Sequence, residues 1–378
     1  MGSQRYSGIW TGDSQTNYEN VEMSVNMLLT LGVTGIVFGG CDIPGFYGEP
    51  NDDLFVQFYQ LGQYYPFMRA HNNIPRDFNQ ANDNFSRREP WLQSERIQLV
   101  IKNAVRGRYE NIHYLYTQFR HANFHGLPIM RPMWMEFPQD TNTFPLGNQF
   151  MWGDNFLVAP KLGQPQKMGL AMNGVYNITV YLPPEADWYV QQTKEFVAGS
   201  SDFQWLLVGD NEFATFVKAG SIIPFLQVKE SAMSLMQTIE DNIRIEVFPD
   251  GSDVATGSLY LDDFQTHEYR NGAYSFVQYD YDGTVLSVTK MCSQCGYYKA
   301  SNKMINEVQF MNVEQIPYAV VNRWLNNTPY PDQGTVYVDF VYLPDTKLLK
   351  VGPVSIPMDD GLVFMQPQEL IEIVWSHP

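Results

Sequence analysis

Three short polar segments follow one another near the start of the chain: Trp10-Thr-Gly-Asp13, Gly40-Cys-Asp42-Ile-Pro-Gly-Phe46 and Phe67-Met-Arg69-Ala-His71. Asp13, Asp42 and His71 lie at successive intervals of 29 residues. This spacing suits consecutive strand-end loops of a β/α barrel, whose loops meet at one face. The sequence therefore predicts part of such a barrel, with these polar side chains lining one pocket.

The residues between these segments alternate between helix and strand patterns. Apolar residues at helical spacing predict a helix over 21–31, and residues 52–61 predict another. The apolar runs 35–38 and 64–68 are typical of short buried strands. Residues 91–125 form a further helical region, which we interpret as the last barrel helix. This order of elements implies a parallel sheet.

After residue 125 the pattern changes to Pro- and Gly-rich sequence with short alternating strands, such as Val175–Tyr181. We predict three domains: the barrel part over residues 1–125, one β-sandwich over 126–226 and a second over 227–378. The length of 378 residues is sufficient for two or three domains with their own cores.

The composition excludes some classes of function. A net charge of −17 and a pI near 4.7 argue against a nucleic-acid partner, because phosphates would be repelled. A neutral substrate fits this charge better. No stretch approaches the roughly 18 to 20 apolar residues of a membrane span. Aromatic residues make up 15% of the chain, and flat rings suit the apolar faces of sugars as well as β-sandwich cores.

The three polar segments resemble the catalytic barrel of the retaining α-glucosidases of glycoside hydrolase family 31. The resemblance also includes Gly2-Ser-Gln-Arg5-Tyr, Arg87-Arg-Glu-Pro-Trp91 and Met130-Arg-Pro-Met-Trp134, and it extends to about residue 270. It implies a fold of class α/β plus all-β, namely the C-terminal part of a (β/α)8 TIM barrel followed by two β-sandwich domains. We expect no cofactor and no metal. The segment at Arg87 favours the members that trim N-glycans in the endoplasmic reticulum.

The resemblance assigns roles to individual residues. Retaining hydrolysis needs a nucleophilic carboxylate and, about 5 to 5.5 Å away, a carboxyl group that serves as acid and then as base. The resemblance makes Asp13 this acid/base. It also implies a set of substrate-binding residues, namely Trp10, Asp42, Phe46, Arg69 and His71. Within this set, we expect Arg69 to form an ion pair with a carboxylate of the site.

Each of these residues also has a plainer interpretation. An Asp after a Gly is commonly a turn residue, as Asp13 would be, and Asp42 could cap the turn that follows it. His71 could be an ordinary core or surface histidine. The shared register of the three segments favours the functional interpretation.

The chain departs from the family pattern in two places. Ser14 stands where an Asn usually follows the acid/base. More seriously, no segment of the type Trp-x-Asp-Met-Asn-Glu, which carries the family's nucleophile, is present in the sequence. We expect the chain to be the C-terminal portion of a longer enzyme, or a truncated gene product. We also expect it to hydrolyse no α-glucoside by itself.

Three functional hypotheses remain open. The first is an α-glucosidase that removes glucose from N-glycans, pairs with a regulatory β subunit and resides in the endoplasmic-reticulum lumen or elsewhere in the secretory pathway. The second is a general α-glucosidase or α-xylosidase acting on free oligosaccharides. The third is a non-catalytic carbohydrate-binding or structural module built mainly from the two sandwiches.

The cysteines allow more than one interpretation. Cys292-Ser-Gln-Cys295 could be a redox or zinc half-site, but a zinc site would need ligands that the spacing does not provide. A local disulfide or two free thiols on a turn fit better.

Two further features carry weaker signals. The triplets beginning at Asn84, Asn177 and Asn326 match the N-glycosylation acceptor pattern and are compatible with the secretory pathway. Asp262 and Asp263 could bind calcium, although adjacent carboxylates on a turn are usually just solvated.

Overall fold

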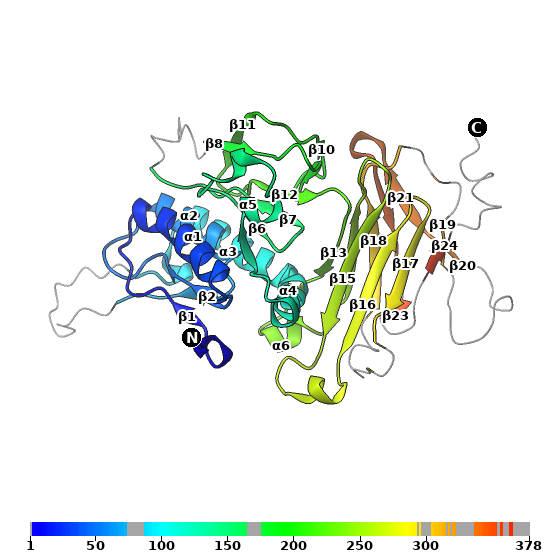
Figure 1. The fold of residues 1–378 in the computed structure, drawn as a ribbon, viewed down its shortest axis with the longest axis horizontal. Coiled ribbons are helices and arrows are strands. Elements are labelled where there is room, and N and C mark those ends of the chain that lie inside the picture. Colours follow the sequence, from blue (N-terminus) through cyan, green and yellow to red (C-terminus); the bar gives the residue numbers. More distant parts are fainter. Residues whose placement is uncertain are drawn as a thin grey trace. The chain divides into compact units, whose positions relative to one another are not determined.

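The computed structural model describes residues 2–73, 87–164, 175–292, 295, 304–314, 317, 320–322, 336–353, 356–357 and 363–365 (Figure 1). The chain forms two compact units that alternate along the sequence. The first unit comprises Met1–Arg108, His121–Ala186 and Ala198–Phe216, and the second comprises Tyr109–Arg120, Asp187–Val197 and Val217–Pro378.

The first unit begins with part of a β/α barrel. Its elements are β1 (Ile9–Trp10), α1 (Tyr18–Val33), β2 (Gly39–Gly40), β3 (Asp42–Ile43), α2 (Asp52–Gly62) and β4 (Arg69–Ala70). β1 pairs with β2 and β3 pairs with β4, both in parallel. The stretch 39–43 is therefore the middle one of three neighbouring strands, as the 29-residue spacing predicts.

The two barrel helices begin where their sequences provide a cap. The Asn17 side chain accepts a hydrogen bond from the backbone of Asn20 at 2.8 Å, and Asn51 does the same for Leu54 at 2.9 Å. These bonds satisfy amide groups that the first helical turn leaves open. The helices predicted over 21–31 and 52–61 are thereby confirmed, with α1 longer at both ends.

Both short strands predicted after these helices are wrong. Residues 35–38 and 64–68 lie in turns and coil, and the actual strands begin at Gly39 and Arg69. A Cβ atom on Gly40 would lie 2.0 Å from the carbonyl oxygen of Phe67. The strand is built from glycine because a neighbouring backbone passes too close for a side chain, so it carries no apolar signal.

The remaining elements up to Gly209 that precede or flank the large sheet are helices and antiparallel strands, and residues 109–120, which include the first part of the helix beginning at Ile112, belong to the second unit. These elements are η1 (Ser3–Arg5), η2 (Pro90–Leu92), α3 (Glu95–Glu110), α4 (Ile112–His125), β5 (Met130–Pro132), α5 (Met133–Glu136), η3 (Thr141–Thr143), β6 (Phe150–Trp152), β7 (Phe156–Val158), β8 (Val175–Tyr181) and β11 (Phe203–Gly209). β5, β6 and β7 pair in sequence order, and β8 pairs with β11. The predicted strand Val175–Tyr181 is confirmed as β8.

The second unit is mainly β-sheet. Its elements are β9 (Trp188–Val190), β10 (Phe196–Val197), β13 (Ser221–Leu226), α6 (Leu235–Thr238), β14 (Ile243–Phe248), β15 (Ala255–Leu261), η4 (Glu268–Asn271), β16 (Ser275–Tyr281), β17 (Val285–Lys290), β18 (Met304–Phe310), β19 (Val320–Asn322), β20 (Val336–Val338), β21 (Phe340–Leu343), η5 (Pro344–Thr346), β22 (Leu348–Val351), β23 (Ile356–Pro357) and β24 (Val363–Met365), with β12 (Thr215–Lys218) at its edge in sequence. Figure 1 shows the long strands β15, β16 and β17 side by side, as their pairing requires.

One large sheet dominates this unit. Within the described part of the chain it has ten strands, in the order β21-β22-β18-β14-β13-β15-β16-β17-β24, with β23 joined to β18. Alternate side chains of the central strands form the core; examples are Ile245, Leu259 and Tyr279, each at most 1% exposed.

The predicted fold class, a partial barrel followed by β-sheet structure, is confirmed. The domain limits after residues 125 and 226 stay predictions. β13 ends at Leu226, yet it pairs along its length with β14 and so continues into the large sheet. Among the described residues, no helix combines the length and the apolar character that crossing a membrane requires.

The structure settles the cysteine pair and shows where one of the three N-glycosylation triplets lies. Cys292 and Cys295 form a disulfide, which was one of the two interpretations favoured from their spacing. Asn177 lies within β8, whereas Asn84 and Asn326 lie outside the described residues.

Asp262 and Asp263 have structural partners. Asp262 is 3% exposed and accepts hydrogen bonds from the hydroxyls of Tyr116 and Tyr260 and from the amide of Phe264. Asp263 accepts hydrogen bonds from the residues of the turn that follows it. These hydrogen bonds give both carboxylates a structural role.

A buried ion cluster lies on β14. Glu246 is 1% exposed, and its carboxylate contacts Lys194 at 2.5 Å and Arg244 at 2.8 Å. Burial by itself would raise the pKa of Glu246, but the two cations together outweigh burial and hold this pKa below its usual value.

The stability of the second unit should therefore depend on pH through Glu246. Because its folded-state pKa is depressed, its contribution is complete above the ordinary glutamate pKa and is lost as the pH falls through the lower folded-state value. Replacing Glu246→Gln should lower the free energy of unfolding by about 2 kcal/mol at pH 7, and this difference should shrink in acid. Urea unfolding of both proteins at pH 7 and pH 3 measures it. An equal difference at both values would contradict the assignment.

Candidate active site

Asp42 is the centre of the site. It lies in β3, is completely buried, and is opposite Arg69 in the parallel pair with β4. Its Oδ1 accepts one hydrogen bond from the indole N–H of Trp10 at 2.9 Å and another from the Arg69 guanidinium at 2.7 Å. Its other oxygen, Oδ2, is buried and has no hydrogen-bond partner among the described residues. A buried carboxylate oxygen left in this condition is costly unless a ligand satisfies it.

Arg69 holds this carboxylate and also stacks on aromatic rings. Its guanidinium carbon lies 5.4 Å from the centre of the Trp10 ring and 5.8 Å from that of Phe67. The expected ion pair between Arg69 and a site carboxylate is present, and the carboxylate is that of Asp42.

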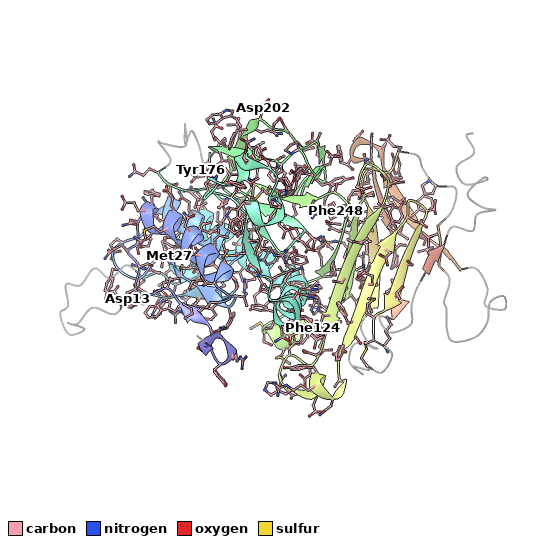
Figure 2. The ribbon with its side chains drawn as sticks, in the orientation of Figure 1. Asp13, Met27, Phe124, Tyr176, Asp202 and Phe248 are labelled. Carbon is pink, nitrogen blue, oxygen red and sulfur yellow. A yellow bond between two sulfur atoms is a disulfide. The ribbon has the colours of Figure 1, made fainter. Side chains whose placement is uncertain are left out.

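Asp13 lies in the exposed loop that follows β1 (Figure 2). The hydroxyl of Tyr47 donates a hydrogen bond to its Oδ2 at 3.0 Å. Tyr47 packs edge-on against Phe46, with ring centroids 4.7 Å apart, and Phe46 packs in turn against His71 at 5.0 Å. Direct side-chain contacts therefore run from Asp13 to His71.

Backbone hydrogen bonds join the loops that carry these residues. The carbonyl of Ser14 accepts from the amides of Phe46 at 2.8 Å and Tyr47 at 2.9 Å. The amide of His71 donates to the carbonyl of Ile43 at 3.0 Å. The loops after three neighbouring strands are thus fastened together, and all six residues predicted for the site belong to one connected cluster.

Arg88 holds the loop that follows Asp42. It is 5% exposed and donates to the carbonyl oxygen of Gly45 at 2.6 Å and to that of Gly48. Burial lowers the pKa of Arg88, and the nearby carboxylates of Glu49 and Asp42 partly offset this effect. The segment that begins at Arg87 therefore helps to fix the loop between Asp42 and Gly48.

Sequence reasoning missed Tyr47, Arg88 and Cys41. Tyr47 directly follows Phe46, and only the fold shows that its hydroxyl reaches Asp13. Cys41 accepts a hydrogen bond from the Thr11 hydroxyl at 3.0 Å, and burial raises the pKa of its thiol to about 11. Because the thiol stays protonated near neutral pH, Cys41 is a poor nucleophile.

The chemistry available here is that of carboxylates and hydrogen-bond donors. Asp13 presents a carboxyl group at the surface of the site, and Asp42 can accept a hydrogen bond from a ligand hydroxyl. Within the described ranges, no group of three or more His, Cys, Asp or Glu side chains is placed to bind a metal ion.

Fold and site together define a β/α-barrel protein whose strand-end loops present an acidic cluster walled by aromatic rings. Two family profiles match the sequence. The one described as "Glycosyl hydrolases family 31 TIM-barrel domain" covers residues 1–118, and "Glycosyl hydrolase family 31 C-terminal domain" covers 126–223. The chain belongs to glycoside hydrolase family 31.

Curated relatives carry α-glucosidase names. "Probable glucan 1,3-alpha-glucosidase" of Arabidopsis thaliana is 38% identical over 302 residues, which is 78% of this chain and 30% of that protein. "Neutral alpha-glucosidase AB" of Homo sapiens is 33% identical over 271 residues, or 71% of this chain and 26% of that protein. The chain spans about a third of the length of the curated relatives it matches.

Solved structures share the fold. The chain matches glucosidase II α subunit, in a structure described as Glc1Man2-bound, with a TM-score of 0.82 and 22% identity over 96% of this chain and 38% of that one. The catalytic subunit in a heterodimeric complex of ER glucosidase II gives a TM-score of 0.82 and 24% identity with the same coverage.

Proposed function

We propose that the chain provides the acid/base and sugar-binding side of a retaining α-glucosidase that removes terminal α-linked glucose from oligosaccharides. One observation carries this proposal: the buried Asp42 is held by Trp10 and Arg69, keeps one oxygen without a partner, and lies in the same loop cluster as Asp13 and His71. An oxygen in this state suits a sugar hydroxyl, which can donate to it.

The remaining residues then have defined roles. Asp13 protonates the leaving glycosidic oxygen and later accepts a proton from water, and Tyr47 holds its carboxyl group through Oδ2. His71 binds a hydroxyl of the cleaved sugar, and Phe46 keeps the His71 ring in place. A second carboxylate must act as nucleophile, and the sequence carries no segment of that type. The 378-residue chain alone is therefore expected to show no turnover of an aryl α-glucoside.

For the substrate we propose N-glycans that carry terminal glucose, with the protein located in the endoplasmic-reticulum lumen and paired with a regulatory subunit. Support comes from the fold shared with the catalytic subunit of ER glucosidase II, which was solved with part of its regulatory subunit. The names of the plant relatives favour a second candidate, a glucosidase acting on free α-1,3-glucan.

Binding of methyl α-glucoside to the purified chain tests the sugar pocket. The indole N–H of Trp10 is a local reporter in 1H–15N NMR because it donates to Asp42. We expect its signal to shift in a saturable way with methyl α-glucoside. In Asp42→Ala the titration should be lost, while Asp202→Ala, which removes an exposed carboxylate of the same unit, should behave as the unchanged protein. Equal titration of the Trp10 signal in Asp42→Ala would reject the pocket.

Turnover is tested in a hybrid enzyme, in which this chain replaces the matching segment of the Arabidopsis relative. The hybrid provides the missing nucleophile. Release of glucose from a Glc-α1,3-linked glycan, compared with maltose, separates the glycan-trimming function from a general α-glucosidase.

A further inference from the structure

A cavity of about 680 Å³ opens in the first unit, and the Asp42 cluster contributes no residue to it. Its walls come from α1, the loop around Gly147, the residues Pro160 and Leu162, and the paired strands β8 and β11. Figure 2 labels Met27 on α1 and Tyr176 on β8, which locates two of these walls. The volume lies in the range of small-molecule sites.

One wall carries an exposed indole. Trp205 is 71% exposed, although burial of a Trp side chain is strongly favourable in free energy. It pairs directly with Thr179 across the two strands, and Asn177 lies two residues before Thr179. All three side chains therefore project from one face, because residues directly opposite each other, and those two apart in a strand, share a face.

Polar groups complete the lining. Asn177 lines the cavity, and its Oδ1 is buried without a hydrogen-bond partner among the described residues. Glu22 and Asn26 are one helical turn apart on α1, and Asn148 lies on the facing loop. The cavity thus combines one flat apolar surface with three amides, a hydroxyl and a carboxylate.

Two glycines leave room for the α1 side chains. A Cβ atom on Gly147 would lie 2.7 Å from Oδ1 of Asn26, and one on Gly163 would lie 2.5 Å from Oε1 of Glu22. Both distances are too short for a real Cβ contact. The backbone at these two positions therefore lies close to the polar ends of Asn26 and Glu22.

We propose that this cavity is a second binding site, and that it takes a neutral oligosaccharide of hexopyranose units. The indole stacks on the apolar face of a sugar ring, while the amides and the carboxylate exchange hydrogen bonds with its hydroxyls. No Lys or Arg lies among the described lining residues, and Glu22 adds negative charge, so an anionic ligand is disfavoured. The site shares its class of ligand with the proposed function but none of its residues.

The test uses maltoheptaose and the indole N–H signals of the full 378-residue chain in 1H–15N NMR. The protein is made in a bacterial host, so that Asn177 carries no attached sugar. The Trp205 signal, assigned from Trp205→Phe, should titrate both in the unchanged protein and in Asp42→Ala. An oligogalacturonate of the same length should leave it unmoved.

Matched variants separate stacking from folding. Measured by isothermal titration calorimetry, Trp205→Ala should weaken maltoheptaose binding in the Asp42→Ala background by about tenfold or more, and Trp205→Phe, which keeps a ring, should weaken it less. Trp91→Ala is the control, because Trp91 belongs to the same unit and is also 71% exposed. It should leave this binding unchanged, and circular dichroism checks that all variants are folded.

The outcomes distinguish this site from the proposed active site. If maltoheptaose fails to move the Trp205 signal while methyl α-glucoside still titrates Trp10, the second site is rejected and the proposed function stands. If the Trp205 signal titrates while Trp10 does not respond, the proposed function fails and the second site stands. Equal affinity in Trp205→Ala and in its parent would also overturn the inference.

Discussion

Replacing Asp13→Asn in the hybrid enzyme should lower kcat/KM for maltose by about 10²- to 10⁴-fold, which is the usual contribution of a positioned proton donor. The asparagine keeps the size of the side chain and can still accept the hydrogen bond from Tyr47, so the loop should hold its shape. Only the transferable proton is lost. Initial rates at several maltose concentrations measure the change.

A substrate whose leaving group needs no proton provides the sharper control. α-Glucosyl fluoride releases fluoride, so its first step should be much less sensitive to Asp13→Asn than that of maltose. Asp202→Asn, an exposed carboxylate in the same unit, should leave both rates unaltered. If both substrates lost activity by the same factor, Asp13 would be a structural residue and not the acid.

Replacing Asp262→Ala should lower the free energy of unfolding by about 3 to 5 kcal/mol, the largest stability effect that we expect. The carboxylate accepts hydrogen bonds from Tyr116 at 2.8 Å, Tyr260 at 3.0 Å and the amide of Phe264 at 2.8 Å. Burial, reinforced by the charge of Asp262, raises the pKa of both tyrosines, so they remain donors. Alanine would leave these donors without an acceptor and open a small void.

Thermal and urea unfolding measure this loss, and the neighbouring aspartate is the control. Asp263 accepts hydrogen bonds from Gln265 and Thr266 in the exposed turn that follows it, so Asp263→Ala should cost about 1 kcal/mol or less. Similar losses for the two variants would show that Asp262 has no special part in the core of the second unit.

The parts of the fold that could be predicted are those with local signals. The helices α1 and α2 have a cap and an apolar face within their own sequences, and β8 alternates through Val175–Tyr181. The glycine strand at Gly39–Gly40 has no such signal, because the carbonyl of Phe67 determines its composition.

The second failed strand has a similar cause. Tyr64 and Tyr65 are buried although they belong to no strand, and their hydroxyls pair with distant partners, Thr215 at 2.8 Å and Ser24 at 2.5 Å. Contacts over such distances in sequence leave no local trace.

The candidate site shows the same division. Motif spacing predicted that Asp13, Asp42 and His71 lie at the ends of neighbouring strands; Asp42 belongs to β3 itself, and the loops that carry Asp13 and His71 are joined to the segment after it by hydrogen bonds. The contributions of Tyr47 and Arg88 depend on where a hydroxyl and a guanidinium end in space. The positions of Tyr47 and Arg88 along the chain do not indicate which groups their side chains reach.

The alternation of the two units along the sequence affects how the protein must be made. Tyr116 and its acceptor Asp262 are 146 residues apart, although both belong to the second unit. At 5 to 20 residues per second, the ribosome needs roughly 7 to 30 s to deliver the second partner after the first. During that delay the aromatic side chains of α4 lack the later strands that they contact. The nascent polypeptide should therefore engage chaperones until β15 emerges.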